Sequence, residues 1–310
     1  MQTTKKAGLG QNNTSSKIFY TLLVLLPSLQ FLIFYVFVNI NSFSLAFKIF
    51  PSGVLKEYEW SVLNFTNWFT DATANKEMTN AIWVSIKSYL ISVVAGVPLG
   101  MFFSYYMFKR MPGSTIFRVM LFMPSILSGA VIATIYNMVT TRVLGGSGGI
   151  LEQWFQIQNF DFWDKEHRYA TLMFFNIFVS FGTSVLMYTN RMDSIDPEMI
   201  EAGNLDGASG LSEFWYIVLP QIFSVVQVFL MTGFAGIFSN QLNSLMLFSY
   251  EAPSEVQSVG YLLWRGVARA GGNVTQMGPF AALGLMITIV IVPLTFLFRW
   301  AINKIGWSEE

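Results

Sequence analysis

Charged residues leave six long gaps along this sequence. The gaps cover residues 18–47, 88–108, 119–141, 169–190, 214–250 and 270–298. A helix needs roughly 20 apolar residues to cross about 30 Å of hydrocarbon, and each gap is long enough. Strands of a membrane barrel would instead give segments of about ten alternating residues. The pattern therefore predicts six transmembrane helices, near 18–39, 82–108, 116–139, 169–190, 222–246 and 277–300.

The composition also indicates a protein that sits in the membrane. Of the 310 residues, 53% are hydrophobic and only 12% are charged. A typical soluble chain has a charged fraction of about 25%. A water-soluble domain must cover its surface with polar side chains, which this composition does not supply. We expect an integral membrane protein in contact with lipid.

Several kinds of chemistry are excluded by the same composition. The chain has no cysteine and one histidine, which excludes disulfides, thiolate metal sites and clusters of histidine ligands. The histidine, His167, falls in a polar stretch and is expected to be a solvated loop residue rather than a catalytic base. Basic and acidic residues balance at 18 each, so no nucleic-acid surface is expected.

The spans predict one membrane domain over residues 18–305. A flexible tail is expected at 1–17, where the residues are small or polar, and a short C-terminal tail at 306–310. The two longer loops on one side, 40–80 and 140–168, are too small for a separate domain of ordinary size.

The basic residues indicate the orientation of the chain. Lys109, Arg110 and Arg118 crowd one short loop. Short loops rich in lysine and arginine remain on the cytoplasmic side of a membrane. The N-terminus and the C-terminus are then both expected to be cytoplasmic.

One cytoplasmic loop, residues 191–220, has the pattern of two short helices. Asp196 followed by Pro197 is typical of an N-cap with proline at the first helical position. The Asp-Gly pair at 206–207 ends the first helix. The candidates for the cap of the second helix are Ser209 and Ser212.

Two roles suit a helix–turn–helix between spans. Ile200, Ala202 and Leu205 give the first helix an apolar side, which suits docking of a partner protein. The alternative is an amphipathic connector that lies on lipid headgroups. Acidic residues outnumber basic residues in this loop, which weakens the lipid alternative.

The residues of this loop closely resemble the EAA loop of ABC-importer permeases. That pattern is Glu-Ala-Ala, two variable residues, Asp-Gly-Ala, five variable residues, then Phe-x-x-Ile-x-Leu-Pro. The chain has Glu201-Ala-Gly-x-x-Asp206-Gly-Ala, then Phe214-x-x-Ile217-x-Leu-Pro. Gly203 replaces the second alanine, which lowers helix propensity by roughly 1 kcal/mol. The resemblance implies an all-α polytopic membrane protein with six transmembrane helices in the type I importer permease (MetI-like) fold.

Further residues resemble the carbohydrate importers within that family. Residues 195–202, Ile-Asp-Pro-Glu-Met-Ile-Glu-Ala, are similar to the sugar-importer variant of the loop. The third span resembles that of the larger, MalF-like permease at Arg118, Phe122, Pro124, Ser128 and Val131. Two features depart from the family: Glu-Ala-Pro-Ser at 251–254 stands where Thr-Gly-Gly-Pro is common, and the long outer domain of the enterobacterial maltose protein is missing.

The resemblance implies a set of partners in the bacterial cytoplasmic membrane. The chain would form a heterodimer with a second sugar permease, together with ABC ATPase subunits and an extracellular solute-binding protein or lipoprotein. It would not be an enzyme, because ATP and Mg²⁺ would be bound by the ATPase; the sequence has no Gly-x4-Gly-Lys-Ser/Thr motif. No cofactor or metal is expected in this chain. The residues expected to contact the ATPase are Glu198, Glu201, Ala202, Asp206, Gly207 and Ala208.

Uncharged polar residues within the spans are candidates for the substrate path. Such residues are expensive in lipid and often line transport pathways. The candidates are Tyr136, Asn137, Asn176, Gln227, Asn240, Gln241 and Asn243. Amides near aromatic rings suit a neutral sugar, and we expect an oligosaccharide. The alternative for each is a hydrogen bond between helices.

Other functions stay open on the sequence alone. The same fold could carry a polyol, a glycerophosphodiester or a peptide. A membrane-embedded enzyme or acyltransferase would need clustered acids, histidine or cysteine at the membrane face, and the acids cluster only in the 191–220 loop. A secondary carrier would leave that loop without a purpose.

Overall fold

The structure is a computed structural model that describes residues 14–305. The predicted tails at 1–17 and 306–310 lie outside the described residues, except for the start of the first helix at Thr14. Helices dominate the described part, which confirms the all-α class. Five of its helices are long and apolar enough to cross a membrane: Ile18–Ala46, Ala72–Phe108, Arg168–Met192, Leu211–Ala235 and Gly278–Lys304.

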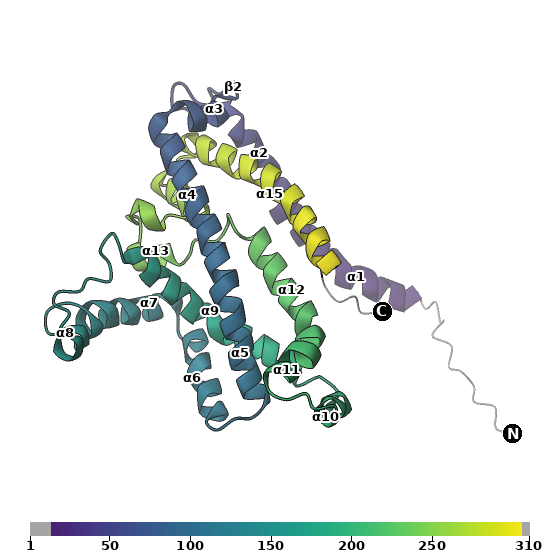
Figure 1. The fold of residues 1–310 in the computed structure, drawn as a ribbon. Coiled ribbons are helices and arrows are strands. Elements are labelled where there is room, and N and C mark those ends of the chain that lie inside the picture. The colour runs from purple at the N-terminus through teal and green to yellow at the C-terminus, as the bar shows by residue number, and fades with distance from the viewer. Residues whose placement is uncertain (1–13, 306–310) are drawn as a thin grey trace.

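The first span is one rod that packs against the last. The rod is made of α1 (Thr14–Gln30), η1 (Phe31–Phe37) and α2 (Val38–Ala46). α2 contacts α15 (Gly278–Ile305), and the two run side by side in Figure 1. A short antiparallel ladder then follows, in which β1 (Lys48–Ile49) pairs with β2 (Glu59–Trp60).

The second span begins earlier than predicted. After α3 (Leu63–Thr70), a continuous helix is formed by α4 (Ala72–Ile91), η2 (Ser92–Gly96) and α5 (Val97–Phe108). The predicted start at residue 82 was wrong because it followed hydropathy alone. Asp71 caps the true start, where its side chain accepts hydrogen bonds from the backbone N–H groups of Thr73 at 2.8 Å and Ala74 at 3.1 Å.

The third predicted span, 116–139, is two helices rather than one. α6 (Ser114–Ile126) ends where Leu127 and Ser128 become extended, with ψ of 151° and 143°. α7 (Gly129–Met138) then starts with Ser128 as its N-cap. It leads through η3 (Val139–Leu144) to α8 (Ile150–Phe155), far from α6 in Figure 1. In the described part, the five long spans are unbroken, whereas the third predicted span consists of two shorter helices.

The fifth span lies earlier in the chain than the predicted 222–246, because its helix covers Leu211–Ala235. α12 (Leu219–Ala235) stops at Gly236, and Leu242 and Asn243 both have a φ of 54°, which no helix continues through. The remaining elements are α9 (Arg168–Met192), α10 (Pro197–Leu205), α11 (Leu211–Glu213), η4 (Phe214–Val218), α13 (Ser244–Phe248), η5 (Ser254–Val256), α14 (Val259–Arg269) and η6 (Val274–Gln276).

Helix α9 lies at the centre of the arrangement. It packs against α5, α6 and α12, while α15 packs against α12 and α14. Figure 1 places α10, α11 and the α5–α6 turn at one end of the molecule, and α3 with the short ladder at the other. The 191–220 loop is therefore presented at one end of the bundle.

Candidate coupling surface and membrane cavity

Helix α10 is capped at both ends by residues within or next to it. Asp196 Oδ1 accepts a hydrogen bond from Glu198 N at 3.0 Å, with Pro197 next to the cap, as predicted. At the other end Gly207 has a φ of 87°. Its N–H donates to Asn204 O at 3.1 Å, and Ala208 N donates to Gly203 O at 2.9 Å. This is the Schellman pattern, which favours glycine at the left-handed position and ends the helix sharply.

The buried side of α10 is held by packing. Ile200 contacts an apolar cluster that includes Met192, Phe214 and Val218. Gly203 faces Ile217, and a methyl group added at Gly203 would overlap Cδ1 of Ile217. Gly203 lowers the helix propensity of α10, but its missing side chain leaves the space that Ile217 occupies. The departure from the family pattern therefore has a packing reason.

We expect Gly203→Ala to loosen α10 and Ile217→Val to restore it. Alanine gains roughly 1 kcal/mol of helix propensity, but its methyl group meets Ile217 unless that side chain moves. Removing Cδ1 with Ile217→Val frees the space. Hydrogen exchange should show faster exchange of the α10 amides in Gly203→Ala than in the double variant. Equal or slower exchange in the single variant would show that Ile217 moves aside without cost.

The exposed side of α10 combines acidic and apolar groups. Of the predicted coupling residues, Glu198, Glu201, Ala202, Asp206 and Gly207 are exposed, and Ala208 is half-buried. Leu205 is 89% exposed. We call Glu198, Glu201, Leu205 and Asp206 the coupling surface. This exposed leucine beside three carboxylates makes the surface a candidate docking site.

The second half of the loop is anchored differently from the prediction. Gly210 rather than a serine is the N-cap of α11, and Ser212 Oγ instead bonds Ser209 at 2.9 Å. Glu213 is 1% exposed and contacts Lys109 Nζ at 2.6 Å. This pair could not be predicted from the sequence, because the two residues are far apart in the chain and belong to no motif.

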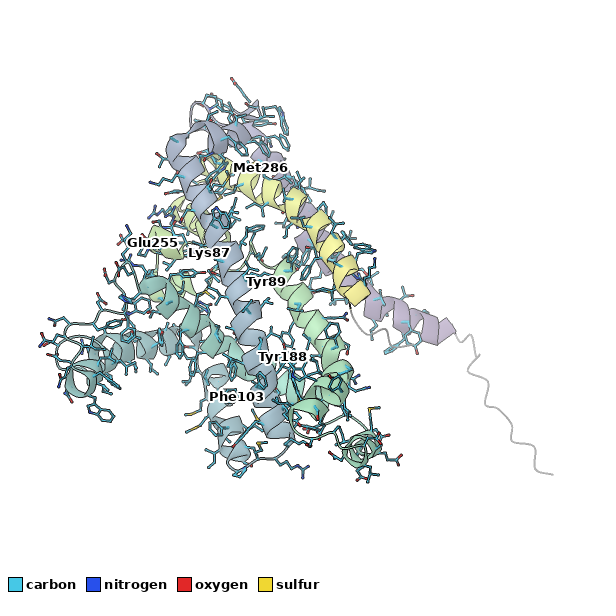
Figure 2. The ribbon with its side chains drawn as sticks, viewed as in Figure 1. Lys87, Tyr89, Phe103, Tyr188, Glu255 and Met286 are labelled. Carbon is cyan, nitrogen blue, oxygen red and sulfur yellow. The ribbon has the colours of Figure 1, made fainter. Side chains whose placement is uncertain are left out.

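A cavity of about 450 Å³ lies between the α4–α5 helix, α9 and α12. Figure 2 shows Tyr89 and Tyr188, one below the other, between the α4–α5 helix and α12. The residues that line it include six with a hydroxyl group, two phenylalanines and one asparagine: Tyr89, Ser92, Ser180, Thr183, Ser184, Tyr188, Phe181, Phe229 and Asn240. Three of these hydroxyls, those of Tyr89, Ser180 and Ser184, also donate to backbone carbonyl groups. None of the described residues that line it is charged.

The predicted path residues divide into one that lines this cavity and six that do not. Asn240 lines it. The Asn176 side-chain amide donates to Leu242 O at 2.7 Å, and its oxygen accepts a hydrogen bond from Asn243 Nδ2 at 2.8 Å. Asn176 and Asn243 therefore fix the position of the chain after α12. Two others bond backbone carbonyls: the Tyr136 hydroxyl donates to Thr171 O at 2.8 Å, and the Gln227 amide donates to Ile302 O at 3.4 Å. The last two are Asn137, which is exposed, and Gln241, which is half-buried.

The fold is that of a multi-pass membrane protein with the 191–220 loop at one end. Residues 96–306 match the family described as the inner membrane component of binding-protein-dependent transport systems. The chain belongs to this family. It is therefore a membrane component of a transport system rather than an enzyme.

Several relatives carry more specific descriptions. The arabinooligosaccharides transport system permease AraP of Bacillus subtilis is 25% identical over 274 residues, covering 85% of this chain and 82% of the relative. The multiple sugar-binding transport system permease MsmF of Streptococcus mutans is 24% identical, with coverages of 88% and 90%. Among solved structures, a bacterial importer of alginate superposes with a TM-score of 0.74 at 17% identity, covering 94% of this chain and 98% of that chain. At that identity the match concerns the fold.

Proposed function

We propose that this chain is one of two permease subunits in an ATP-driven importer. The coupling surface docks on ABC ATPase subunits, which bind ATP and Mg²⁺, and the chain forms half of the translocation pathway with a second permease. The observation that carries this proposal is the exposed surface of α10. This helix is capped at both ends, and its other side packs against the apolar cluster. Closure of the ATPase dimer would then move the spans attached to the loop.

We also propose the sides of the membrane from the coupling surface. ATPase subunits are cytoplasmic, so α10 and both termini lie in the cytoplasm, and α3 and α14 lie outside, where a solute-binding protein or lipoprotein delivers the substrate. The crowded bases Lys109, Arg110 and Arg118 support this orientation. A solved alginate importer was captured with its pentasaccharide-bound periplasmic protein, which supports such a partner here. The membrane is the bacterial cytoplasmic membrane.

For the substrate we propose a neutral oligosaccharide. The cavity offers hydroxyls, one amide and aromatic rings, which suit the hydroxyls and weakly apolar faces of sugar rings. The names of AraP and MsmF point to the same class. Another relative is the sn-glycerol-3-phosphate permease UgpA of Escherichia coli, 22% identical over 250 residues. A phosphate ester would be expected to meet arginine or lysine, and no such residue lines this cavity among residues 14–305.

Affinity purification from native membranes in mild detergent tests the proposed assembly. Mass spectrometry of the co-purified proteins should find a second permease and an ABC ATPase with the unaltered chain. The ATPase should be lost from the Glu201→Arg/Gly207→Val variant, which alters the coupling surface and its turn. Glu59→Arg, at the opposite end of the molecule, is the matched control and should retain it. Recovery of the chain alone, under conditions that preserve a known importer, would contradict the proposal.

A further inference from the structure

A buried carboxylate lies at the base of the 191–220 loop and takes no part in the coupling surface. Glu213 is 1% exposed. Its Oε1 lies 2.6 Å and its Oε2 2.7 Å from Nζ of Lys109. Lys109 directly follows α5, so this ion pair joins the loop to the cytoplasmic end of the α4–α5 helix.

A second contact joins the same two segments one turn away. Tyr105, on α5, lies with its hydroxyl 3.0 Å from Gly210 O and 3.3 Å from Glu213 Oε1. Tyr105 and Lys109 are four residues apart and therefore lie on one face of the helical turn. The end of α5 thus holds residues 210–213 at two points.

These contacts give the loop a second attachment to the walls of the cavity. The loop continues through α11 and η4 directly into α12, which supplies Phe229 to the cavity. The α4–α5 helix supplies Tyr89 and Ser92 to the facing wall. We infer that Glu213 is a positioning residue: through Lys109 and Tyr105 it ties the loop to the α4–α5 helix, so that displacement of α10 moves both walls together. The inference rests on the proposed function.

The chemistry of the contact favours a positioning role over plain packing. Burying two charges costs desolvation energy, and well-packed apolar residues often serve stability equally well. What an apolar pair cannot supply is the direction and register of charge-assisted hydrogen bonds. Stability and positioning can therefore be separated by choosing the right pair of variants.

The first test compares two double variants in the complete reconstituted transporter. Lys109→Met/Glu213→Leu should keep the melting temperature close to that of the unaltered protein. The amount of maltotriose, arabinotriose or another transported oligosaccharide moved per ATP hydrolysed should fall by about five-fold or more, the lower end of allosteric couplings. Lys109→Glu/Glu213→Lys reverses the charges and should recover most of that ratio. Normal transport per ATP in the apolar variant would overturn the inference.

The second test needs no ATPase. The chain has no cysteine, so Leu205→Cys and Leu99→Cys place two spin labels on α10 and α5 in the isolated permease. Their distance distribution should be narrow, broaden in Lys109→Met/Glu213→Leu and narrow again with the reversed charges. An unchanged distribution would show that the Lys109–Glu213 ion pair does not hold the loop against the α4–α5 helix. A different outcome is that the distribution broadens but the chain recruits no ATPase. The Lys109–Glu213 contact would then hold the loop as inferred, but its coupling role and the proposed function would both be refuted.

Discussion

Replacing Leu205 by glutamate is expected to abolish ATP-driven uptake while the permease stays folded. Leu205 is 89% exposed, so its removal should change the free energy of unfolding little. If Leu205 is a hot spot of the interface, its loss should cost about 2 kcal/mol or more, roughly 30-fold in affinity. A fourth carboxylate beside Glu198, Glu201 and Asp206 also adds repulsion. Uptake of labelled oligosaccharide and ATPase co-purification measure both effects.

Leu55→Glu provides the matched control for this change. Leu55 is 57% exposed in the loop between β1 and β2, at the opposite end of the molecule. The same substitution there should leave both ATPase association and uptake close to normal. Equal loss in both variants would show that added charge alone, rather than loss of a docking contact, harms the protein.

Tryptophan at Ser180 is expected to block transport without releasing the ATPase. Ser180 lies on α9, and its exposed side chain lines the cavity of about 450 Å³. An indole ring there would occupy a large part of the proposed sugar path. Uptake should fall by about ten-fold or more, because the ring would fill the space that a sugar ring needs. ATPase association, measured by co-purification, should be retained.

Met187→Trp on the same helix separates blockage from damage to α9. Met187 is 49% exposed and does not line the cavity among the described residues. It should accept tryptophan with near-normal uptake. If Ser180→Trp transported normally, the cavity between the α4–α5 helix, α9 and α12 would not be the substrate path.

Hydropathy predicted where the chain crosses the membrane but not where its helices stop. Charge-free stretches located all the long spans, because the cost of charge in lipid acts over about 20 residues. The ends depend on local backbone conformation. Leu127 and Ser128 interrupt an apolar run, and α12 stops at Gly236 although the apolar run continues to Tyr250. Nothing in hydropathy distinguishes a span from an apolar loop packed inside the protein.

The two parts of the candidate site were predictable to different degrees. Caps and turns are local, so Asp196, Pro197 and Gly207 indicated the ends of α10 from sequence alone. The tie between Lys109 and Glu213 joins distant segments and depends on how α5 meets α11. The amides chosen for the path mostly serve the fold, as with Asn176 and its bonds to the chain after α12. Serine, threonine and tyrosine hydroxyls supply the cavity instead, and their spacing is common to many helices.

Photo-crosslinking from position 205 tests the central claim most directly. Leu205→Cys introduces the single thiol of the chain, which can carry a benzophenone label into native membranes. The proposed function predicts an adduct with an ABC ATPase subunit, whose yield changes when ATP is bound, and no such adduct from a label at Leu55→Cys. If the label at position 205 formed adducts with lipid alone, or formed none with an ATPase subunit, the assignment of α10 as the coupling surface would be contradicted.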